Sequence, residues 1–282
     1  MLTKVEAFSQ WAEAPTLALD DNGREESDLI QLQGITGLDP VNATVTTSAY
    51  GSIDGAVYTG GTVGTRNIVL TLKPNPDWVN WTVASLRRLI YTYFMPKQAV
   101  NLRFQSDDIP TVAISGIVES CSANPFAQEV LITVSIICPN PYFQAINPTI
   151  FSGTTGAAAT RIQYNGTVET GMNVKLRNIP GETPSYLHVV NYDLNTEFDV
   201  NVTLNDNIYC EVNSVPGSKY AQLVNTANGT VQNVLGQVVN VSWNTWALLQ
   251  PGNNSIAIGA GDANKSWNLN WEISFYELYG GL

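Results

Sequence analysis

Hydrophobic and polar residues alternate along most of this chain, the pattern of β-strands with one buried face. In the segment 65–73, for example, Ile68, Leu70 and Leu72 fall on the same side. The same alternation predicts strands at 29–33, 41–47, 100–104, 112–118, 130–138, 198–204, 208–212, 222–224, 238–243, 255–258 and 267–275. Before residue 29 we expect only a polar hairpin or loop at 19–28. The chain is therefore predicted to be mainly β.

One segment breaks the alternation and predicts a single helix at about 77–94. Apolar residues recur there at spacings of four, three, four and four, which gives one apolar stripe: Val79, Val83, Leu86, Ile90 and Phe94. Asn75 is a suitable N-cap with Pro76 at the first helical position, and Pro96 follows the end. We expect this helix to be buried in the first half of the chain.

Length and turn chemistry predict two domains. A chain of 282 residues exceeds one typical domain, and its hydrophobic content of 44% suffices for two cores. The two prolines in Cys138-Pro-Asn-Pro-Tyr-Phe143 predict a corner that ends the first strand series. We therefore expect an N-terminal β-sandwich-like domain with the helix at 1–147 and a C-terminal β-sandwich at 148–282.

Charge narrows the choice of partners. The net charge is −11, from 13 basic and 24 acidic residues, so sequence-specific binding of nucleic acid is not expected. The same charge suits a pore through which a polyanion slides without binding. No segment approaches the roughly 18 apolar residues of a membrane span, so no membrane-spanning segment is expected.

Residues able to carry catalysis or bind a metal are sparse. Cys121, Cys138 and Cys210 form no Cys-x-x-Cys pair, and we expect them to be small buried hydrophobic residues. His188 is the only histidine, lies in a strand-like segment without a Gly-x-Ser-x-Gly motif, and is expected to be structural. We therefore predict no catalytic residue, no metal and no cofactor, and a protein that is not an enzyme.

Two groups of aromatic residues are candidates for contacts. The Gly- and Thr-rich segment 48–64 is predicted to be an extended arm or long hairpin, with Tyr50 and Tyr58 as candidate oligomerisation residues. Trp243 and Trp246 flank a predicted turn and are the candidate exposed aromatics. Trp267 and Trp271, by contrast, share a strand face with apolar residues and are assigned to the core.

The order of these features resembles the distal tail protein family of siphophages. The resemblance rests on Gly34-Ile-Thr-Gly37, the Gly-rich arm, a helix with Arg87-Arg88, the step Pro96-Lys97 and the corner Cys138–Phe143. In the second half, Leu249-Gln-Pro-Gly-Asn-Asn254 precedes a predicted strand, as a similar turn does in that family.

The resemblance implies a structural protein of the phage tail tip. The N-terminal domain would form a hexameric ring that joins the tail tube protein to the tail-tip hub protein, with DNA passing through its lumen. The C-terminal domain would be a galectin-like sandwich on which receptor-binding or side-fibre proteins dock. The protein would be assembled in the host cytoplasm and reside in the virion.

Two alternatives remain open on the sequence. The C-terminal sandwich could be a carbohydrate-binding module for host surface glycans, with Trp243 and Trp246 as stacking residues. It could also be a glycoside hydrolase, which would need two facing carboxylates in a cleft.

Overall fold

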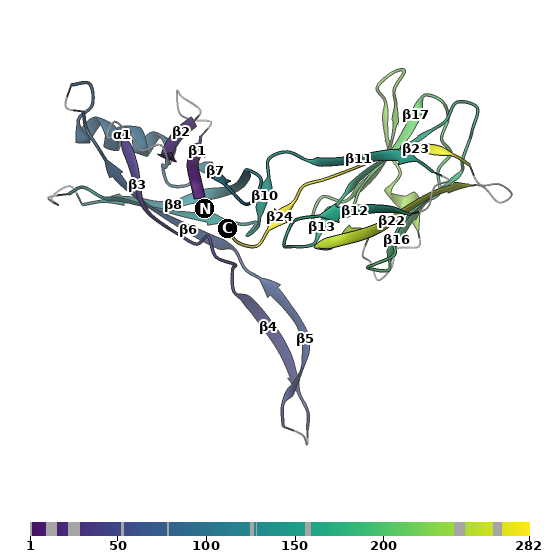
Figure 1. Ribbon diagram of the computed structural model, residues 1–282, viewed down its shortest axis with the longest axis horizontal. Coiled ribbons are helices and arrows are strands. Elements are labelled where there is room, and N and C mark those ends of the chain that lie inside the picture. The colour runs from purple at the N-terminus through teal and green to yellow at the C-terminus, as the bar shows by residue number, and fades with distance from the viewer. Residues whose placement is uncertain are drawn as a thin grey trace. The chain divides into compact units, whose positions relative to one another are not determined.

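The computed structural model describes residues 2–9, 16–21, 29–51, 54–77, 79–124, 127, 129–155, 159–239, 246–261 and 267–282, and it is mainly β as predicted (Figure 1). The chain forms two compact units, Met1–Ile146 with Tyr279–Leu282, and Asn147–Leu278. The sequence placed a domain boundary at about residue 147. It gave no sign that the last four residues return to the first unit.

The first unit is built around one antiparallel sheet. In spatial order its strands are β2 (Thr16–Asp21), β1 (Leu2–Phe8), β7 (Ala99–Ser106), β8 (Val112–Ala123), β9 (Ile132–Cys138), β6 (Arg66–Pro74) and β3 (Ile30–Thr36). Strand β10 (Phe143–Ala145) pairs with β8, and β24 (Leu278–Tyr279) pairs with β10. Strands β1 and β2 were not predicted, although β2 covers the start of the segment assigned to a polar hairpin or loop.

Alternate residues of these strands form the core of the first unit. Ile68, Leu70 and Leu72 of β6 are buried, as their shared face predicted, and lie in one cluster with residues of β7 and β9. The edge strands β2 and β3 approach each other, so the sheet curls around this core. Helix α1 (Val83–Tyr93) adds Ile90 and Tyr93 to the same cluster.

Helix α1 begins six residues later than the predicted start at residue 77. The carboxylate of Asp77 accepts hydrogen bonds from the N–H groups of Val79, Asn80 and Trp81 at 3.0, 2.9 and 2.7 Å, which makes a turn. Thr82 is the actual N-cap, in a reciprocal capping box with Ser85. Asn75 and Pro76 therefore lie outside the helix, and so does Val79, which is 86% exposed.

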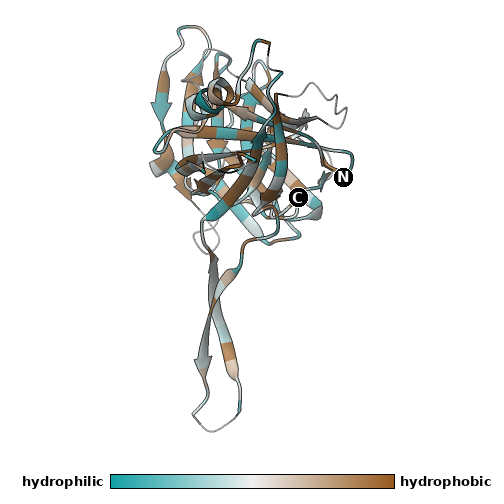
Figure 2. Cartoon of the chain, turned by 90° about the vertical axis from the view of Figure 1, so that its left-hand side faces the viewer, coloured by the Kyte–Doolittle hydropathy of each residue, from teal (hydrophilic) through white to brown (hydrophobic). Residues whose placement is uncertain are grey.

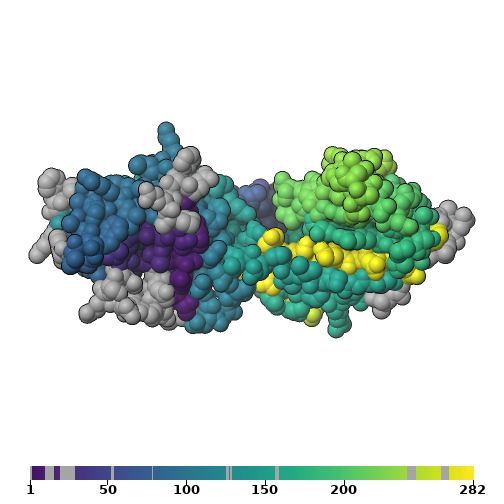
Figure 3. Space-filling model, turned by 90° about the horizontal axis from the view of Figure 1, so that it is seen from above, coloured from purple at the N-terminus to yellow at the C-terminus, as the bar shows by residue number. Residues whose placement is uncertain are grey.

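The second unit is a sandwich of two antiparallel sheets, as predicted for this half of the chain. One sheet has the order β11 (Thr149–Thr154), β23 (Leu269–Phe275), β14 (Asn173–Asn178), β17 (Ile208–Asn213), β18 (Tyr220–Asn225) and β19 (Val231–Asn233). The other has β12 (Thr160–Tyr164), β22 (Gly252–Gly261), β15 (Tyr186–Asn191), β16 (Thr196–Val200) and β20 (Val238–Val239). A short pair, β13 (Thr170–Gly171) with β21 (Leu248–Leu249), completes the unit. In Figure 3 the yellow surface of β23 lies between its teal neighbours β11 and β14.

Both sheets of the second unit contribute to one core. Leu176 and Ile273 come from the six-stranded sheet, whereas Val189 and Phe198 come from the five-stranded sheet. The apolar face predicted at 198–204 is buried, although regular strand pairing of β16 ends at Val200. The face predicted at 267–275 is buried from Leu269 on, whereas Trp267 precedes β23 and is only partly buried.

The Leu249–Asn254 turn closes on a buried asparagine. Asn254 is fully buried, and its side chain accepts from the N–H of Gln250 and donates to the carbonyls of Gln250 and Gly252. A second buried asparagine, Asn191, donates to the Asn254 carboxamide oxygen at 2.9 Å. Gly252 has a φ of +96°, a conformation that favours glycine. The motif is therefore a structural turn.

All three cysteines are free thiols. Cys138 and Cys210 are buried as predicted, whereas Cys121 is only partly buried. Burial raises the pKa of Cys121 and Cys138 to about 11 and that of Cys210 to about 12. The thiols therefore stay protonated at neutral pH, as inert structural cysteines do.

Candidate assembly interface

A long hairpin leaves the sheet of the first unit between β3 and β6. It consists of β4 (Ala43–Ala49) and β5 (Ala56–Val63), which pair with each other in a two-stranded sheet of their own. Figure 1 and Figure 2 both show it extending away from the curled sheet. The segment 48–64 was predicted to be an arm or hairpin, and the hairpin is longer because β4 starts at Ala43.

The two strands of the hairpin are largely exposed and carry no charged residue. All residues of β4 are exposed, Val45 to 59%, and Tyr58 of β5 is exposed to 65%. Neither strand contains Asp, Glu, Lys or Arg. An exposed strand edge is normally protected by charge or proline, and a two-stranded sheet alone is only marginally stable in water. These features are typical of a segment that pairs with another chain.

Tyr50 and Tyr58 both lie on this hairpin, with Tyr50 exposed beyond the end of β4. Part of the Tyr58 ring packs locally, because a Cβ on Gly61 would lie 3.1 Å from the Tyr58 hydroxyl oxygen. Tyr58 thus covers the glycine that lacks a side chain, as aromatics do in strands. The rest of the Tyr58 ring remains accessible.

The base of the hairpin depends on a glycine that precedes it. Gly37 has a φ of +88°, and a Cβ there would lie 2.0 Å from the carbonyl oxygen of Asn67. No other residue fits without moving the backbone of β6. Gly37 thus allows the segment that leads into β4 to approach the backbone of β6 closely.

Arg66 joins both ends of the hairpin. It is the first residue of β6, three positions after β5, and is 1% exposed. Its Nη1 donates to the carbonyls of Gly37 and Asp39, which precede β4, at 2.5 and 2.7 Å. Its Nε donates to the carbonyl of Pro141 at 2.6 Å, and its Nη2 to that of Gly280 at 2.5 Å.

The environment of Arg66 explains how a buried guanidinium is tolerated. Its four acceptors are backbone carbonyls, and the ring of Phe143 lies 4.4 Å from its Cζ. Charge-assisted hydrogen bonds and a cation–π contact offset desolvation. Burial lowers the pKa of Arg66, while Cys138 and Asp39 act in the opposite direction.

Sequence patterning missed Arg66, although a signal was present. Arg66 lies two residues before Ile68 and four before Leu70, so it shares their face of the predicted strand. It is therefore a charged residue at an inward position. The two N-terminal motifs of the resemblance, around Gly37 and at Cys138–Phe143, meet at this side chain.

The last residues of the sequence close the same cluster. The N–H of Leu282 donates to the carbonyl of Leu38 at 3.1 Å. Gly281 packs on Pro40 so closely that a Cβ would lie 2.7 Å from the proline Cδ. Gly281 and Leu282 thus contact the segment 37–40 that leads into β4, whereas Gly280 contacts Arg66.

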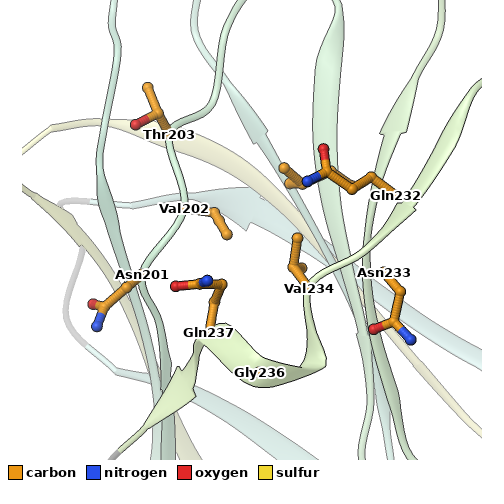
Figure 4. Close-up of a pocket in the computed structure, with 9 residues that line it drawn as sticks. Asn201, Val202, Thr203, Gln232, Asn233, Val234, Gly236 and Gln237 are labelled. Atoms are coloured by element: carbon orange, nitrogen blue, oxygen red, sulfur yellow. The ribbon is translucent and has the colours of Figure 1, made fainter.

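A second candidate is an open pocket of about 420 Å³ in the second unit. It is lined by Asn201, Val202, Thr203, Leu223, Gln232, Asn233, Val234, Gly236 and Gln237. Val202, Val234 and Gln237 point toward one another in it (Figure 4). The lining offers amides and one hydroxyl on an apolar floor, without a charged or aromatic side chain. Such a lining can hydrogen-bond a neutral ligand, and none of its side chains titrates near neutral pH.

The candidate exposed tryptophans are not supported as a binding platform. Trp246 is 7% exposed and packs against Phe198, with Lys219 over its ring, so its predicted exposure was wrong. It belongs to the core because it enters the sandwich beside β21. Trp243 lies outside the described residues.

His188 has a structural partner. Its Nδ1 pairs with Oδ1 of Asp199, the residue opposite it in the β15–β16 register, and Asp199 is buried. The imidazole thus gives a buried carboxylate a hydrogen-bond partner. In the described part of the chain, no three His, Cys, Asp or Glu side chains gather as metal ligands would. No described helix is long and apolar enough to span a membrane.

The outer face of the six-stranded sheet carries a polar network around Glu211. Its carboxylate accepts from Asn173 at 2.9 Å, from Tyr220 at 3.2 Å and from Gln222 at 2.8 Å. Burial raises the pKa of Glu211, but these hydrogen bonds and Lys175 lower it more, so the net shift is below its ordinary value. Glu211 is therefore a stabilised carboxylate, unlike a catalytic acid, whose pKa is raised.

Comparison with known proteins identifies a solved structure with the same fold. No family model and no curated protein matches the sequence. Among solved structures, the Dit protein (gp 19.1) of SPP1 matches 97% of this chain over 98% of its own, with a TM-score of 0.63 and 14% identity. The chain has the fold of SPP1 Dit. That protein is described as a paradigm of the hub adsorption apparatus in phages that infect Gram-positive bacteria.

Two structures of the phage p2 baseplate in its activated conformation, with Sr and with Ca, also match. Their TM-scores are 0.42 and 0.43 at 10% identity, and they cover 96% and 97% of this chain and 97% and 98% of their own. The resemblance to distal tail proteins inferred from the sequence is thus confirmed for the fold by SPP1 Dit, which matches both units.

Proposed function

We propose that this protein is a structural component of a phage tail tip, in which copies of the first unit form a ring. The fold shared with SPP1 Dit supports this role over nearly the whole chain. The observation that carries the proposal is the exposed β4–β5 hairpin, whose strands contain no charged residue, because its unpaired edges need a partner strand.

The proposed ring has six copies and head-to-tail contacts, which close only at the correct rotation angle. The hairpin of one copy reaches the next, where its backbone N–H and C=O groups add to a neighbouring sheet and Tyr50 and Tyr58 fill the contact. One end of the ring binds the tail tube protein and the other the tail-tip hub protein. This role needs no catalytic residue.

Charge supports a DNA channel through such a ring. A chain with a net charge of −11 offers few cations to hold phosphates, so DNA passes through the lumen without being retained. The second unit is the docking platform for receptor-binding or side-fibre proteins. In this account the protein is assembled in the host cytoplasm and resides in the virion.

Negative-stain imaging of the purified chain tests the proposal. We expect annular particles with a central hole. A matched variant replaces residues 46–60 by an Asn-Gly turn, which joins the register partners Val45 and Gly61 in a short hairpin. This variant should fold and remain a monomer. Monomeric particles from the unmodified chain at high concentration contradict the ring.

A further inference from the structure

We infer that Arg66 and residues 280–282 form a clamp that fixes the direction of the β4–β5 hairpin, and that ring assembly depends on this clamp. The clamp itself is a property of the first unit. Its consequence for assembly rests on the proposed function.

The hairpin has few other means of orientation. Its strands pair only with each other among the described residues, and β4 is exposed throughout. The direction of the hairpin is therefore set by its two connections to the sheet, 37–42 and 64–65. A two-stranded ribbon held at its base moves as a lever, so small changes there displace the tip.

Each connection ends at the clamp. The first is held through the carbonyls of Gly37 and Asp39, which accept from Arg66, and through that of Leu38, which accepts from Leu282. The second connection runs directly into Arg66, whose backbone pairs with Cys138 of β9. One guanidinium thus ties both connections together.

The third part of the clamp comes from beyond the second unit. The carbonyl of Gly280 accepts from Arg66, and Gly281 lies against Pro40. Residues 147–278, the whole second unit, intervene in the sequence between Pro141, another acceptor of Arg66, and Gly280. The clamp therefore closes only after the chain beyond the second unit has returned to the first, which delays assembly until both units are made.

Loss of the clamp weakens assembly because fewer copies hold the hairpin in the orientation that fits a neighbour. If the orientation that fits a neighbour falls to about a tenth of the ensemble, the apparent Kd of each contact rises about tenfold. A closed ring multiplies this effect, because every contact must form. No contact residue on the hairpin needs to change.

Two variants test the clamp without touching the hairpin. Gly281→Ala places a Cβ 2.7 Å from Cδ and 2.9 Å from N of Pro40, which forces this contact apart. Deletion of residues 280–282 removes the contacts altogether. Gly236→Ala is the matched control, because its Cβ would meet no atom within 4 Å.

Hairpin direction is measured by pulsed electron paramagnetic resonance between spin labels. Labels at Thr47→Cys on β4 and Arg88→Cys on α1, both exposed, report it within one unit, with Cys121→Ser to prevent further labelling. Labelled chains are diluted with excess unlabelled chains so that distances between copies do not contribute. We expect a narrow distribution for the unmodified chain and for G236A, and a broad one for G281A and the deletion.

Assembly of the same variants, without the cysteine substitutions and labels, is measured by light scattering, and their folding by circular dichroism. We expect the deletion to raise the dissociation concentration of the ring at least about tenfold while the spectrum is unchanged. Measured below the concentration at which rings form, an equally narrow distance distribution in the deletion variant overturns the clamp. If the deletion broadens the distance distribution but the unmodified chain forms no ring, the clamp stands and only the proposed function is contradicted.

Discussion

The guanidinium of Arg66 donates a hydrogen bond of 2.5 Å to the carbonyl oxygen of Gly280, a residue 214 positions further along the chain. The same side chain holds Gly37, Asp39 and Pro141. A single buried charge thus organises the point where the hairpin leaves the sheet.

Replacing Arg66 by methionine is expected to destabilise the first unit. Arg66→Met keeps an apolar stem but leaves buried carbonyls without donors, at about 1–3 kcal/mol for each group left unsatisfied. Removal of the desolvated charge offsets part of this loss, so we expect the free energy of unfolding to fall by about 3–5 kcal/mol. Urea unfolding followed by circular dichroism measures it.

The control for this variant is Arg88→Met, on the exposed side of α1. We expect it to change the free energy of unfolding by less than about 0.5 kcal/mol. Equal effects of the two substitutions on the free energy of unfolding would show that the buried hydrogen bonds of Arg66 do not stabilise the first unit.

Gly37→Ala is expected to be severely destabilising. The new Cβ would lie 2.0 Å from the carbonyl oxygen of Asn67, in a backbone conformation that favours glycine. We expect a loss of more than about 3 kcal/mol, measured by urea unfolding. Gly64→Ala, at the other connection of the hairpin, has open space for its Cβ and should be nearly neutral. A stable G37A chain contradicts the close approach of Gly37 to β6.

A charge on the hairpin is expected to block assembly and spare the fold. Tyr58→Asp places a carboxylate where a neighbouring strand would pack, so its desolvation opposes association. The melting temperature of the monomer should change little, because Tyr58 is largely exposed. Light scattering should show loss of the ring, whereas Tyr192→Asp, an exposed tyrosine of the second unit, should keep it. Intact rings with Y58D would remove the hairpin from the interface.

Alanine substitution of two neighbouring asparagines in the second unit should lower the free energy of unfolding by very different amounts. Asn254 is buried and closes the Leu249–Asn254 turn, so Asn254→Ala leaves Gln250 groups without partners. We expect a loss of about 2–4 kcal/mol in urea unfolding. Asn253→Ala, at the exposed adjacent position, should cost less than about 0.5 kcal/mol. The prediction fails if both variants have the same free energy of unfolding in urea.

Glu211 should make the stability of the second unit depend on pH. Its folded pKa lies below its unfolded value, so the charged form stabilises the fold above pH about 4.3 and this contribution is lost as pH falls through the folded pKa. Thermal unfolding of the unmodified chain and Glu211→Gln should therefore differ most at neutral pH. The difference should shrink below pH about 4. A difference that is constant across this range contradicts a lowered pKa.

Sequence patterning predicted the elements whose burial is set locally. The alternation of Ile68, Leu70 and Leu72 identified a core-facing strand, and the Gly, Thr and small residues of 48–64 indicated an extended arm or long hairpin. The start of α1 was wrong because two capping signals follow each other. Asp77 binds the N–H groups that a helix starting at Asn75 would use, and Thr82 caps the helix instead.

The base of the hairpin could not be predicted, because it depends on contacts between residues far apart in sequence. Arg66 was visible as a charge on an apolar face, but its partners Pro141 and Gly280 follow only from the fold. The predicted exposure of Trp246 was wrong for a related reason, because the burial of a side chain beside a turn depends on how that turn packs against the sheets. His188 could not be paired with Asp199 before the β15–β16 register was known.

The central claim is that copies of this chain associate through the hairpin, and the molar mass in solution tests it most directly. Light scattering across a concentration series should give six times the chain mass of 30.6 kDa for the unmodified protein. The chain with residues 46–60 replaced by an Asn-Gly turn should give the mass of one copy. A single-chain mass for the unmodified protein at every concentration would contradict the account.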